Sequence, residues 1–203
     1  MVLKSTLLNK SNESQSWYDF YKDRVNNTEY FDYFCNKYNP FLNMIQDMVD
    51  NNIHPIAEFG CGTANTTKAL KYMMPRNSYV CYDKDSKMLH LARENLSDRL
   101  SNVLIHYWDV LDEMPVRHYQ LVHTHGLLEH FDDDQIRKIF KNFTYVTDKQ
   151  VHYIPLKGYE EPSYGDERLL DIADWYKILR EFKPSIRRFN GTKDGIITWN
   201  NTK

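Results

Sequence analysis

The amino-acid sequence predicts an α/β fold in which a mostly parallel sheet is covered by helices on both faces. From residue 53 onward, short apolar runs of strand length alternate with segments whose apolar residues recur every three or four positions. This alternation is typical of strand–helix–strand units. The chain then closes with two apolar runs separated by the turn-rich sequence NGTKDG (190–195), which favours a hairpin and an antiparallel sheet edge.

The elements of this core follow one another in a regular order. Apolar runs bounded by turn residues predict strands at 53–59, 78–83, 102–107, 119–125, 151–155, 185–189 and 195–199. Segments with apolar residues on one helical face predict helices at 65–74, 86–96, 134–143 and 172–182. A run of aspartates opens the third helix, where acidic side chains suit the positive N-terminal end. Because the sequence contains no internal repeat or low-complexity tract, we expect its 203 residues to form a single domain.

The segment before this core is helical in pattern. We expect residues 16–52 to form an N-terminal helical cap, because their apolar residues recur at three and four positions. Two amphipathic helices fit, with breaks near Asn26–Asn27 and near Pro40, where a proline can open a helix. The polar residues 1–15 are expected to be flexible.

Composition narrows the classes of function. A formal charge of −2 gives no overall attraction to nucleic acid or to an anionic membrane. The three cysteines are odd in number and lack zinc-type spacing, which favours a reducing, cytoplasmic location. The apolar stretch at the N-terminus is too short for a signal peptide, and no run approaches the length needed to cross a bilayer.

A glycine-containing turn, AEFGCGTANTT (57–67), directly follows the first strand of the core. Ligands of open α/β sheets bind outside the carboxyl ends of the strands. Gly60 and Gly62 lack a Cβ atom, which permits a tight turn and lets a flat ligand approach the backbone. The spacing is not GxGxxG, and no basic residue follows as in a phosphate-binding loop. The turn therefore suits a ligand without a pyrophosphate.

Two aspartates follow the next two strands and are expected on the same rim. Asp83 ends the second strand about twenty residues after the glycine turn, where an acid accepts hydrogen bonds from a ribose diol. Asp109 follows the third strand within the sequence WDV and could accept from an exocyclic amine. Together with the glycine turn, these carboxylates predict a nucleoside pocket.

The sequence resembles class I S-adenosylmethionine-dependent methyltransferases of the Rossmann-like, small-molecule type, from about Trp17 to the C-terminus. The resemblance is carried by the ordered motifs IAEFGCGTANTTKAL, YVCYDKDSKML, WDV and YQLVHTHGLLEHFDD. It implies a three-layer α/β/α sandwich whose seven strands lie in the order 3-2-1-4-5-7-6, with strand 7 antiparallel. It also implies S-adenosyl-L-methionine as cofactor and S-adenosyl-L-homocysteine as product.

The resemblance assigns roles around the methionine and ribose portions of the cofactor. Residues of the first motif would line the methionine portion, namely Glu58, Gly60, Cys61 and Gly62. Asp83 would hold both ribose hydroxyls. Ala64 stands where the family often has a third glycine, which makes the fit tighter. Cys61 is expected to serve by its small size and not as a nucleophile.

The remaining cofactor contacts implied by the resemblance surround the adenine and the sulfonium. Lys84 and Met88 would lie beside the adenine. Asp109 would accept a hydrogen bond from the adenine amino group, while the backbone N–H of Val110 would donate to the ring. His125, at the end of the fourth strand, would face both the sulfonium and the substrate.

Candidates for handling a proton stand in the sequence HTHGLLEHF (123–131). A general base is needed only if the acceptor arrives protonated. For His125 and His130 two interpretations stay open: catalytic base or substrate ligand, or structural residue. For His123 we favour a hydrogen-bonded core residue. For Glu129 we favour a carboxylate that opens the next helix, with a substrate-facing position as the alternative. No recognised ligand spacing completes a metal site, so none is predicted.

The aromatic residues of the first helix allow two interpretations. Trp17 and Tyr21 recur at helical spacing, for which core packing is the default. Alternatively the helix caps the pocket, with these rings facing the substrate and contacting the sulfonium by a cation–π interaction. The sequence EEPSYGDERLLD (160–171) is the predicted substrate-side loop. Asp85 is expected to cap a helix.

Three functions are compatible with these features. A small-molecule methyltransferase is favoured because the sequence carries no added recognition domain for RNA, DNA or protein. A methyltransferase acting on those macromolecules is the second, although His125–Gly126 stands where a base-amino methylase would have Asn-Pro-Pro-Tyr. A non-catalytic binding module is the third. We expect a monomer or homodimer, with no membrane partner.

Overall fold

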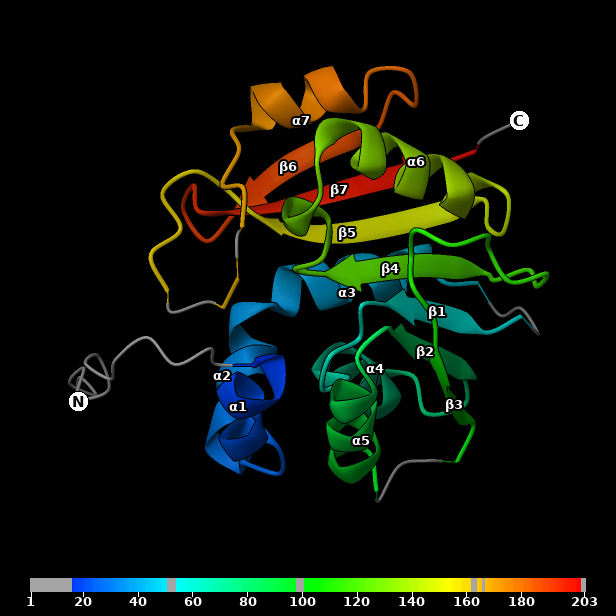
Figure 1. The fold of residues 1–203 in the computed structure, drawn as a ribbon, viewed down its shortest axis with the longest axis vertical. Coiled ribbons are helices and arrows are strands. Elements are labelled where there is room, and N and C mark those ends of the chain that lie inside the picture. Colours follow the sequence, from blue (N-terminus) through cyan, green and yellow to red (C-terminus); the bar gives the residue numbers. More distant parts are fainter. Residues whose placement is uncertain (1–15, 51–53, 98–100, 162–163, 166, 202–203) are drawn as a thin grey trace.

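One seven-stranded sheet organises the chain in the order β3-β2-β1-β4-β5-β7-β6. The computed structural model describes residues 16–50, 54–97, 101–161, 164–165 and 167–201 (Figure 1). The strands are β1 (Ile56–Phe59), β2 (Tyr79–Asp83), β3 (Val103–Tyr107), β4 (Leu121–His125), β5 (Lys149–Pro155), β6 (Ser185–Phe189) and β7 (Asp194–Asn200). Neighbouring strands from β3 to β5 pair in parallel, whereas β7 runs antiparallel to both β5 and β6. The predicted order and orientation are confirmed.

The helices form one layer on each face of this sheet, which confirms the predicted three-layer sandwich (Figure 1). The core helices are α4 (Asn65–Met73), α5 (Ser86–Asn95), α6 (Asp133–Thr144) and α7 (Ile172–Ile178), with a short 3₁₀ helix, η2 (Leu128–His130), before α6. The N-terminal elements are α1 (Trp17–Tyr21), the 3₁₀ helix η1 (Lys22–Arg24), α2 (Thr28–Lys37) and α3 (Asn39–Met48).

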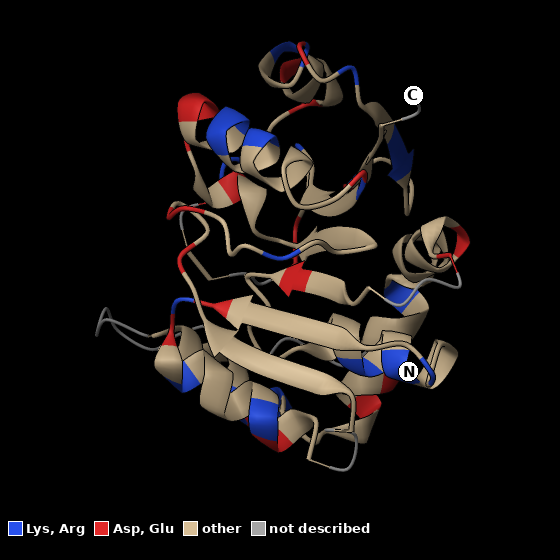
Figure 2. Cartoon of the chain, turned by 90° about the vertical axis from the view of Figure 1, so that its right-hand side faces the viewer, with Lys and Arg blue, Asp and Glu red and all other residues tan. Residues whose placement is uncertain are grey.

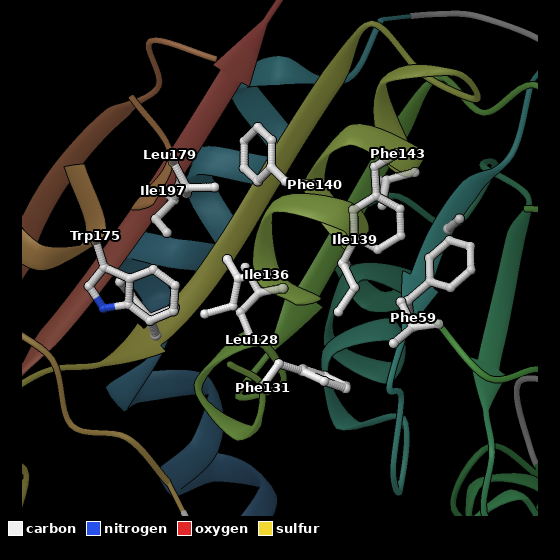
Figure 3. Close-up of a cluster of buried hydrophobic side chains, with 14 of the residues drawn as sticks. Phe59, Leu128, Phe131, Ile136, Ile139, Phe140, Phe143, Trp175, Leu179 and Ile197 are labelled. Carbon is white, nitrogen blue, oxygen red and sulfur yellow. The ribbon is translucent and has the colours of Figure 1, made fainter. Parts of the chain in front are cut away.

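Side chains of the central strands alternate between two hydrophobic clusters. Val80 and Tyr82 of β2 lie in the cluster beneath α6 and α7, whereas Tyr79 and Cys81 lie in the cluster beneath α3, α4 and α5. Figure 3 shows the first of these clusters, in which Phe140 and Phe143 of α6 lie over the strands. Burial on both faces explains why these strands read as continuous apolar runs in the sequence.

The N-terminal segment contains three α-helices where two were expected. The break at Asn26–Asn27 is confirmed: Asn26 has a φ of +57°, and the Asn27 side chain accepts a hydrogen bond from the backbone N–H of Tyr30. The second break falls at Tyr38, so that Pro40 lies in the first turn of α3, as expected of a proline that opens a helix. The residues 1–15, expected to be flexible, lie outside the described residues.

The last helix is shorter than its sequence pattern predicted. α7 ends at Ile178, whereas the pattern extended to residue 182. The backbone N–H of Phe182 turns back to the carbonyl of Leu179, and Lys183 has a φ of +52°. Pro184 follows, and a proline disfavours helical conformation in the residue before it. The chain therefore leaves the helix early and enters β6.

Charged residues lie mainly on the outer helices and loops, with acidic residues at the tips of neighbouring strands (Figure 2). The strands themselves are largely uncharged along their length (Figure 2). Among the described residues, no helix has the length and apolar character required to span a membrane.

Candidate active site

A cavity of about 820 Å³ lies at the carboxyl ends of the central strands. Its strand-end half is formed by the turns that follow β1, β2 and β3, and includes Glu58, Cys61, Gly62, Asp83, Met88 and Val110. Its aromatic half is formed by α1, η1, α2 and the loop after β5, and includes Trp17, Tyr21, Tyr30, Tyr33, Tyr38 and Tyr159. His125 and Gly126, at the end of β4, lie in the wall of the same cavity.

The two glycines of the turn after β1 serve different purposes. Gly60 has a φ of +65°, and a Cβ atom there would lie 2.6 Å from Cδ1 of Leu127, so the position leaves room for the loop after β4. Gly62 has a φ of +53°, and the nearest atom to a Cβ would be Cε of Met88 at 3.6 Å. The left-handed backbone, not crowding, therefore requires glycine at position 62.

Asp83 is held directly against this turn. The backbone N–H of Gly62 donates to Asp83 Oδ2 at 2.8 Å, and the N–H of Asp85 donates to Asp83 Oδ1 at 2.9 Å. Burial raises the pKa of Asp83 above its ordinary value. Each carboxylate oxygen can accept two hydrogen bonds, so both keep capacity for a ligand. The geometry thus leaves a fixed acceptor pair on the cavity wall.

Glu58 lies deeper in the strand-end half and is buried. Its Oε2 accepts from the backbone N–H of Thr67 at 3.1 Å and from the Thr67 hydroxyl at 2.5 Å. Burial raises the pKa of Glu58 to about 7. Glu58 therefore anchors the first turn of α4 while it lines the cavity.

Cys61 is buried in the strand-end half and remains a thiol. A hydrogen bond with Cys81, together with burial, raises the pKa of Cys61 well above its ordinary value. The thiolate is the reactive form of cysteine, so this environment makes Cys61 a poor nucleophile, as expected. Across the described residues, no group of three His, Cys, Asp or Glu side chains could hold a metal ion.

The residues expected beside an adenine fall into two sets. Met88 and Val110 are buried and line the cavity, and Lys84 lines it with an exposed side chain. Asp109 is not among the lining residues: its Oδ1 accepts from the backbone N–H of Leu111 at 3.0 Å, and its Oδ2 lies 3.6 Å from Lys84 Nζ. Its role toward an adenine amino group stays a prediction. Trp108, which the sequence analysis missed, lines the cavity instead.

Asp85 and Ala64 have the local roles that their positions suggested. Asp85 Oδ1 accepts from the backbone N–H groups of Lys87 and Met88, so it caps α5 as expected, and it also lines the cavity. Ala64 is fully buried with a φ of +57°, a left-handed conformation that glycine adopts at lower cost.

His125 ends β4 between two tyrosine rings. It stacks on Tyr153 with 4.4 Å between ring centroids and meets the edge of Tyr38 at 4.3 Å. Burial lowers the pKa of His125 to about 3, so the imidazole is neutral. Its Nε2 has no hydrogen-bond partner within the described part of the chain. The neutral ring therefore borders the cavity, while its unpaired Nε2 is itself buried.

The structure corrects two expectations for the segment around His125. His123 is fully buried as expected, but neither ring nitrogen has a hydrogen-bond partner among the described residues, so the expected hydrogen bond is wrong. Glu129 does not line the cavity. It is buried behind Gly126, with Oε1 3.2 Å from where a Cβ of that glycine would be. Glu129 does not open the next helix either, because Asp132 forms the capping box of α6.

Trp17 and Tyr21 line the cavity, so their default interpretation as core residues is wrong. α1 has no buried residue. The two rings stack with centroids 6.1 Å apart, and Trp17 meets the edge of His130 at 5.3 Å. His130 also lines the cavity. The helix therefore caps the pocket, which is the alternative interpretation of the aromatic spacing.

The loop after β5 is joined to α2 by hydrogen bonds and an ion pair in the aromatic half of the cavity. The Tyr33 hydroxyl donates to Glu161 Oε1 at 2.7 Å, and Lys37 Nζ lies 2.5 Å from Glu161 Oε2. Lys37 Nζ also donates to the Tyr159 hydroxyl at 3.3 Å. Glu161, from the predicted substrate-side loop, thus lines the cavity. The α2 residues had no distinguishing signal in the sequence, because aromatic residues at helical spacing also fit a core-facing helix.

Comparisons with known proteins agree with this architecture. Residues 56–150 match the family model described as a methyltransferase domain. The pyocyanin biosynthetic protein PhzM is 18% identical with a TM-score of 0.67, over 91% of this chain and 62% of that one. PigF with SAH is 14% identical with a TM-score of 0.65, over 93% and 63%. An O-methyltransferase family protein from Burkholderia thailandensis is 9% identical with a TM-score of 0.67, over 94% and 64%.

These similarities differ in what they establish. At identities of 9 to 18%, the three structures show a shared fold. The chain spans less than two thirds of the length of each of them. No curated protein sequence matches the chain. The matched segment 56–150 contains the glycine turn, Asp83 and His125, and so covers the strand-end half of the cavity.

Proposed function

We propose that this chain, whose residues 56–150 form a class I S-adenosylmethionine-dependent methyltransferase domain, transfers a methyl group to a nitrogen, oxygen or sulfur atom of a small molecule. S-adenosyl-L-methionine is the cofactor of this class, and S-adenosyl-L-homocysteine is the product left after transfer. The assignment of residues to the cofactor and of the acceptor to a small molecule belongs to the proposal.

The observation that carries the proposal is the contact between Gly62 and Asp83. A left-handed glycine donates its N–H to the carboxylate at 2.8 Å, and a Cβ at that position would lie in ordinary contact with Met88 Cε at 3.6 Å. Asp83 can then accept from both hydroxyls of a ribose. Met88 and Val110 offer apolar surface for the adenine, and Glu58 and Cys61 lie where the methionine portion would be held.

The aromatic half would hold the acceptor. S-adenosylmethionine, when bound, supplies a methyl group already activated by its positive sulfur. The remaining task is alignment of the acceptor, which can lower a reaction barrier by about 7–11 kcal/mol. Trp17 and Tyr21 line this part of the cavity, and Tyr38 and His125 border it.

His125 is better suited to positioning than to proton abstraction. A general base works best when its pKa lies near the working pH. Burial lowers the pKa of His125 to about 3, so its proton affinity is too low for that task in this environment. Its neutral ring can instead border the acceptor as part of the cavity wall, because its unpaired Nε2 is buried. His130 borders the same space and remains the second candidate ligand.

Calorimetry with S-adenosylhomocysteine tests the cofactor assignment. We expect Asp83→Ala to weaken binding about 100-fold or more, because two hydrogen bonds to a charged carboxylate are lost. Asp112→Ala is the matched control, since Asp112 is an exposed aspartate in the loop after β3 and is not among the cavity-lining residues. Equal affinity of wild-type protein and Asp83→Ala would contradict the proposed site.

The acceptor class is tested with S-adenosylmethionine carrying a labelled methyl group. The wild-type protein is incubated with a host-cell extract divided into a low-molecular-weight filtrate and a macromolecular retentate. Label that appears in the filtrate supports a small-molecule acceptor. Label that appears in RNA, DNA or protein would reassign the acceptor. Binding of S-adenosylhomocysteine without any transfer would indicate a non-catalytic module.

A further inference from the structure

One cationic side chain in the aromatic half has no anionic partner. Arg24 is the last residue of η1 and lines the cavity. Its guanidinium carbon lies 4.0 Å from the ring centroid of Phe20, 5.2 Å from that of Tyr21 and 5.3 Å from that of Tyr30. The side chain is half-buried. Three rings therefore hold this cation at the wall of the cavity.

Two other cations of this region, Lys37 and Lys22, have anionic partners. Lys37 and Glu161 form an ion pair, and Glu161 also accepts from Tyr33. Lys22, two residues before Arg24, pairs with Asp19 at 3.0 Å. No carboxylate within the described part of the chain forms an ion pair with Arg24. Among the described residues that line the aromatic half, Arg24 is thus a cation with no ion pair.

Contact with aromatic rings leaves most of the hydrogen-bonding capacity of arginine unused, although Arg24 also donates a hydrogen bond to the Tyr30 hydroxyl. The rings meet the guanidinium through their π-systems, whereas its five N–H donors lie in the guanidinium plane. A planar fork of this kind matches a carboxylate, which it can bind through two parallel hydrogen bonds. The stacked rings keep the fork in place, which lowers the entropy lost when an anion binds.

The two ends of the cavity differ in charge. The strand-end half contains Asp83, Asp85 and Glu58 together with the exposed Lys84, an acidic excess that suits a cofactor with a positive sulfur. The aromatic half contains Arg24, Glu161 in its ion pair with Lys37, and flat surface from Trp17 and Tyr21. An anionic group would be repelled by the carboxylates and attracted to the opposite end.

We propose that the methyl acceptor is a planar aromatic molecule bearing a carboxylate, and that Arg24 selects it by binding that carboxylate. The inference rests on the proposed function and adds the chemical class of the acceptor. Arg24 is accordingly a specificity-determining residue, since it contacts the part of the acceptor that does not react.

Matched acids and amides test the inference without knowledge of the natural acceptor. Wild-type protein saturated with S-adenosylhomocysteine is titrated by calorimetry with 4-hydroxybenzoate, salicylate and indole-3-acetate, and with the neutral amide of each. We expect at least one acid to bind roughly tenfold or more tightly than its amide, as for a hydrogen-bonded charge pair. Preference for no acid, or binding of none, overturns the inference.

Variants then assign the preference to Arg24. Arg24→Gln should reduce the acid-to-amide affinity ratio to about one, and Arg24→Lys should retain only part of it, because a lysine lacks the planar fork. Lys22→Gln is the matched control: it removes an exposed charge from the same helical turn and should preserve the ratio. An unchanged ratio in Arg24→Gln overturns the assignment.

The design separates failure of this inference from failure of the proposed function. Titration of each variant with S-adenosylhomocysteine reports the strand-end half, and circular dichroism reports folding. Protein that binds S-adenosylhomocysteine but does not discriminate acid from amide contradicts only the acceptor class. Protein that discriminates acid from amide without binding S-adenosylhomocysteine supports the role of Arg24 and contradicts the proposed function. If Arg24→Gln does not fold, the ratio measured on wild-type protein and on Arg24→Lys decides.

Discussion

The two halves of the cavity are built from different kinds of contact. In the strand-end half, Glu58 bonds Thr67 nine residues away, and Gly62 bonds Asp83 across 21 residues on adjacent strands. In the aromatic half, Tyr33 bonds Glu161 across 128 residues. The first half follows from turns at the ends of neighbouring strands. The second depends on two distant segments meeting over the sheet.

The helices of the two halves of the cavity also differ in how many side chains they bury. α4 and α5 each bury several side chains, whereas α1 buries none and α2 buries only Phe34. Elements with few buried contacts open locally at lower free energy than the core does. The comparison teaches that the strand-end half is built on well-buried elements, whereas the aromatic half is built on elements that bury few side chains.

The largest expected effect comes from crowding the strand-end half. We expect Gly60→Ala to lower the free energy of unfolding by about 2–3 kcal/mol, because it adds left-handed strain and a clash with Leu127. Gly191→Ala is the control: its φ is +76°, but nothing lies within 4 Å of a Cβ there, so only about 1 kcal/mol is expected. Urea unfolding measures both. Equal losses of unfolding free energy in the two variants would show that the Leu127 side chain moves aside at little cost. The strand-end half would then be less rigid than its contacts imply.

The second prediction concerns pH, and its titrating groups all lie on or beside the sheet. Burial lowers the pKa values of His123, His125 and His152 to about 3, so the unfolded chain takes up these protons first as pH falls. Their contribution to stability is therefore lost below about pH 6.5. Burial raises the pKa of Glu58 to about 7 and of Glu129 to about 8, so their contribution is lost as pH rises through those values.

Opposite trends on the two sides place the stability maximum at about pH 6–7. Thermal melts between about pH 4.5 and 9 should show a falling midpoint in both directions, with a loss of roughly 2 kcal/mol at the acid end. His123→Leu should flatten the acid side, since His123 is buried without a hydrogen-bond partner among the described residues. A midpoint that stays constant down to about pH 4.5 contradicts the neutral, buried state of these histidines.

A smaller effect is expected from loosening the aromatic half. The Lys37 side chain is 9% exposed and that of Glu161 is 43% exposed, so removal of either charge leaves a different residue behind. Glu161→Gln leaves the buried ammonium of Lys37 without its anionic partner. It should lower the free energy of unfolding by about 1–2 kcal/mol. Lys37→Met leaves the Glu161 carboxylate, which water can solvate. It should lower the free energy of unfolding by less than about 1 kcal/mol.

Hydrogen exchange shows where the effect of Glu161→Gln is felt. We expect faster exchange in α1 and α2 and unchanged exchange in β1 and β2, because the contacts that are lost join only the cap and the loop. Faster exchange throughout the sheet would mean that the two halves unfold as one cooperative unit.

The smallest effect is expected at Asp109. Its carboxylate already accepts from Leu111 and lies near Lys84, outside the cavity lining. A single neutral donor such as an adenine amino group adds about 0.5–1.5 kcal/mol, so Asp109→Ala should weaken S-adenosylhomocysteine binding about threefold to tenfold. A loss as large as that of Asp83→Ala would make the two carboxylates equivalent and would require Asp109 to turn into the cavity.

Prediction from sequence succeeded where structure is local. The strand order came from the family resemblance and is confirmed. The turn at Gly60–Gly62, the position of Asp83 and the helix cap at Asp85 were anticipated from the residues themselves. Each depends on a strand end or a turn, whose residue types reflect backbone requirements directly. Glu129 shows the limit: an acidic residue in a turn fits a helix cap, yet burial behind Gly126 removes it from both expected roles.

The sequence by itself determined the fold class and the strand-end half, because apolar periodicity and turn chemistry act between residues that are close along the chain. Only the tertiary structure decided that Trp17 and Tyr21 face the cavity, that Glu161 meets Lys37, and that Arg24 is left without an anion among the described residues. The physical reason is that the same helical spacing serves a core face and a pocket face. Which of the two a side chain occupies depends on distant segments that pack against it.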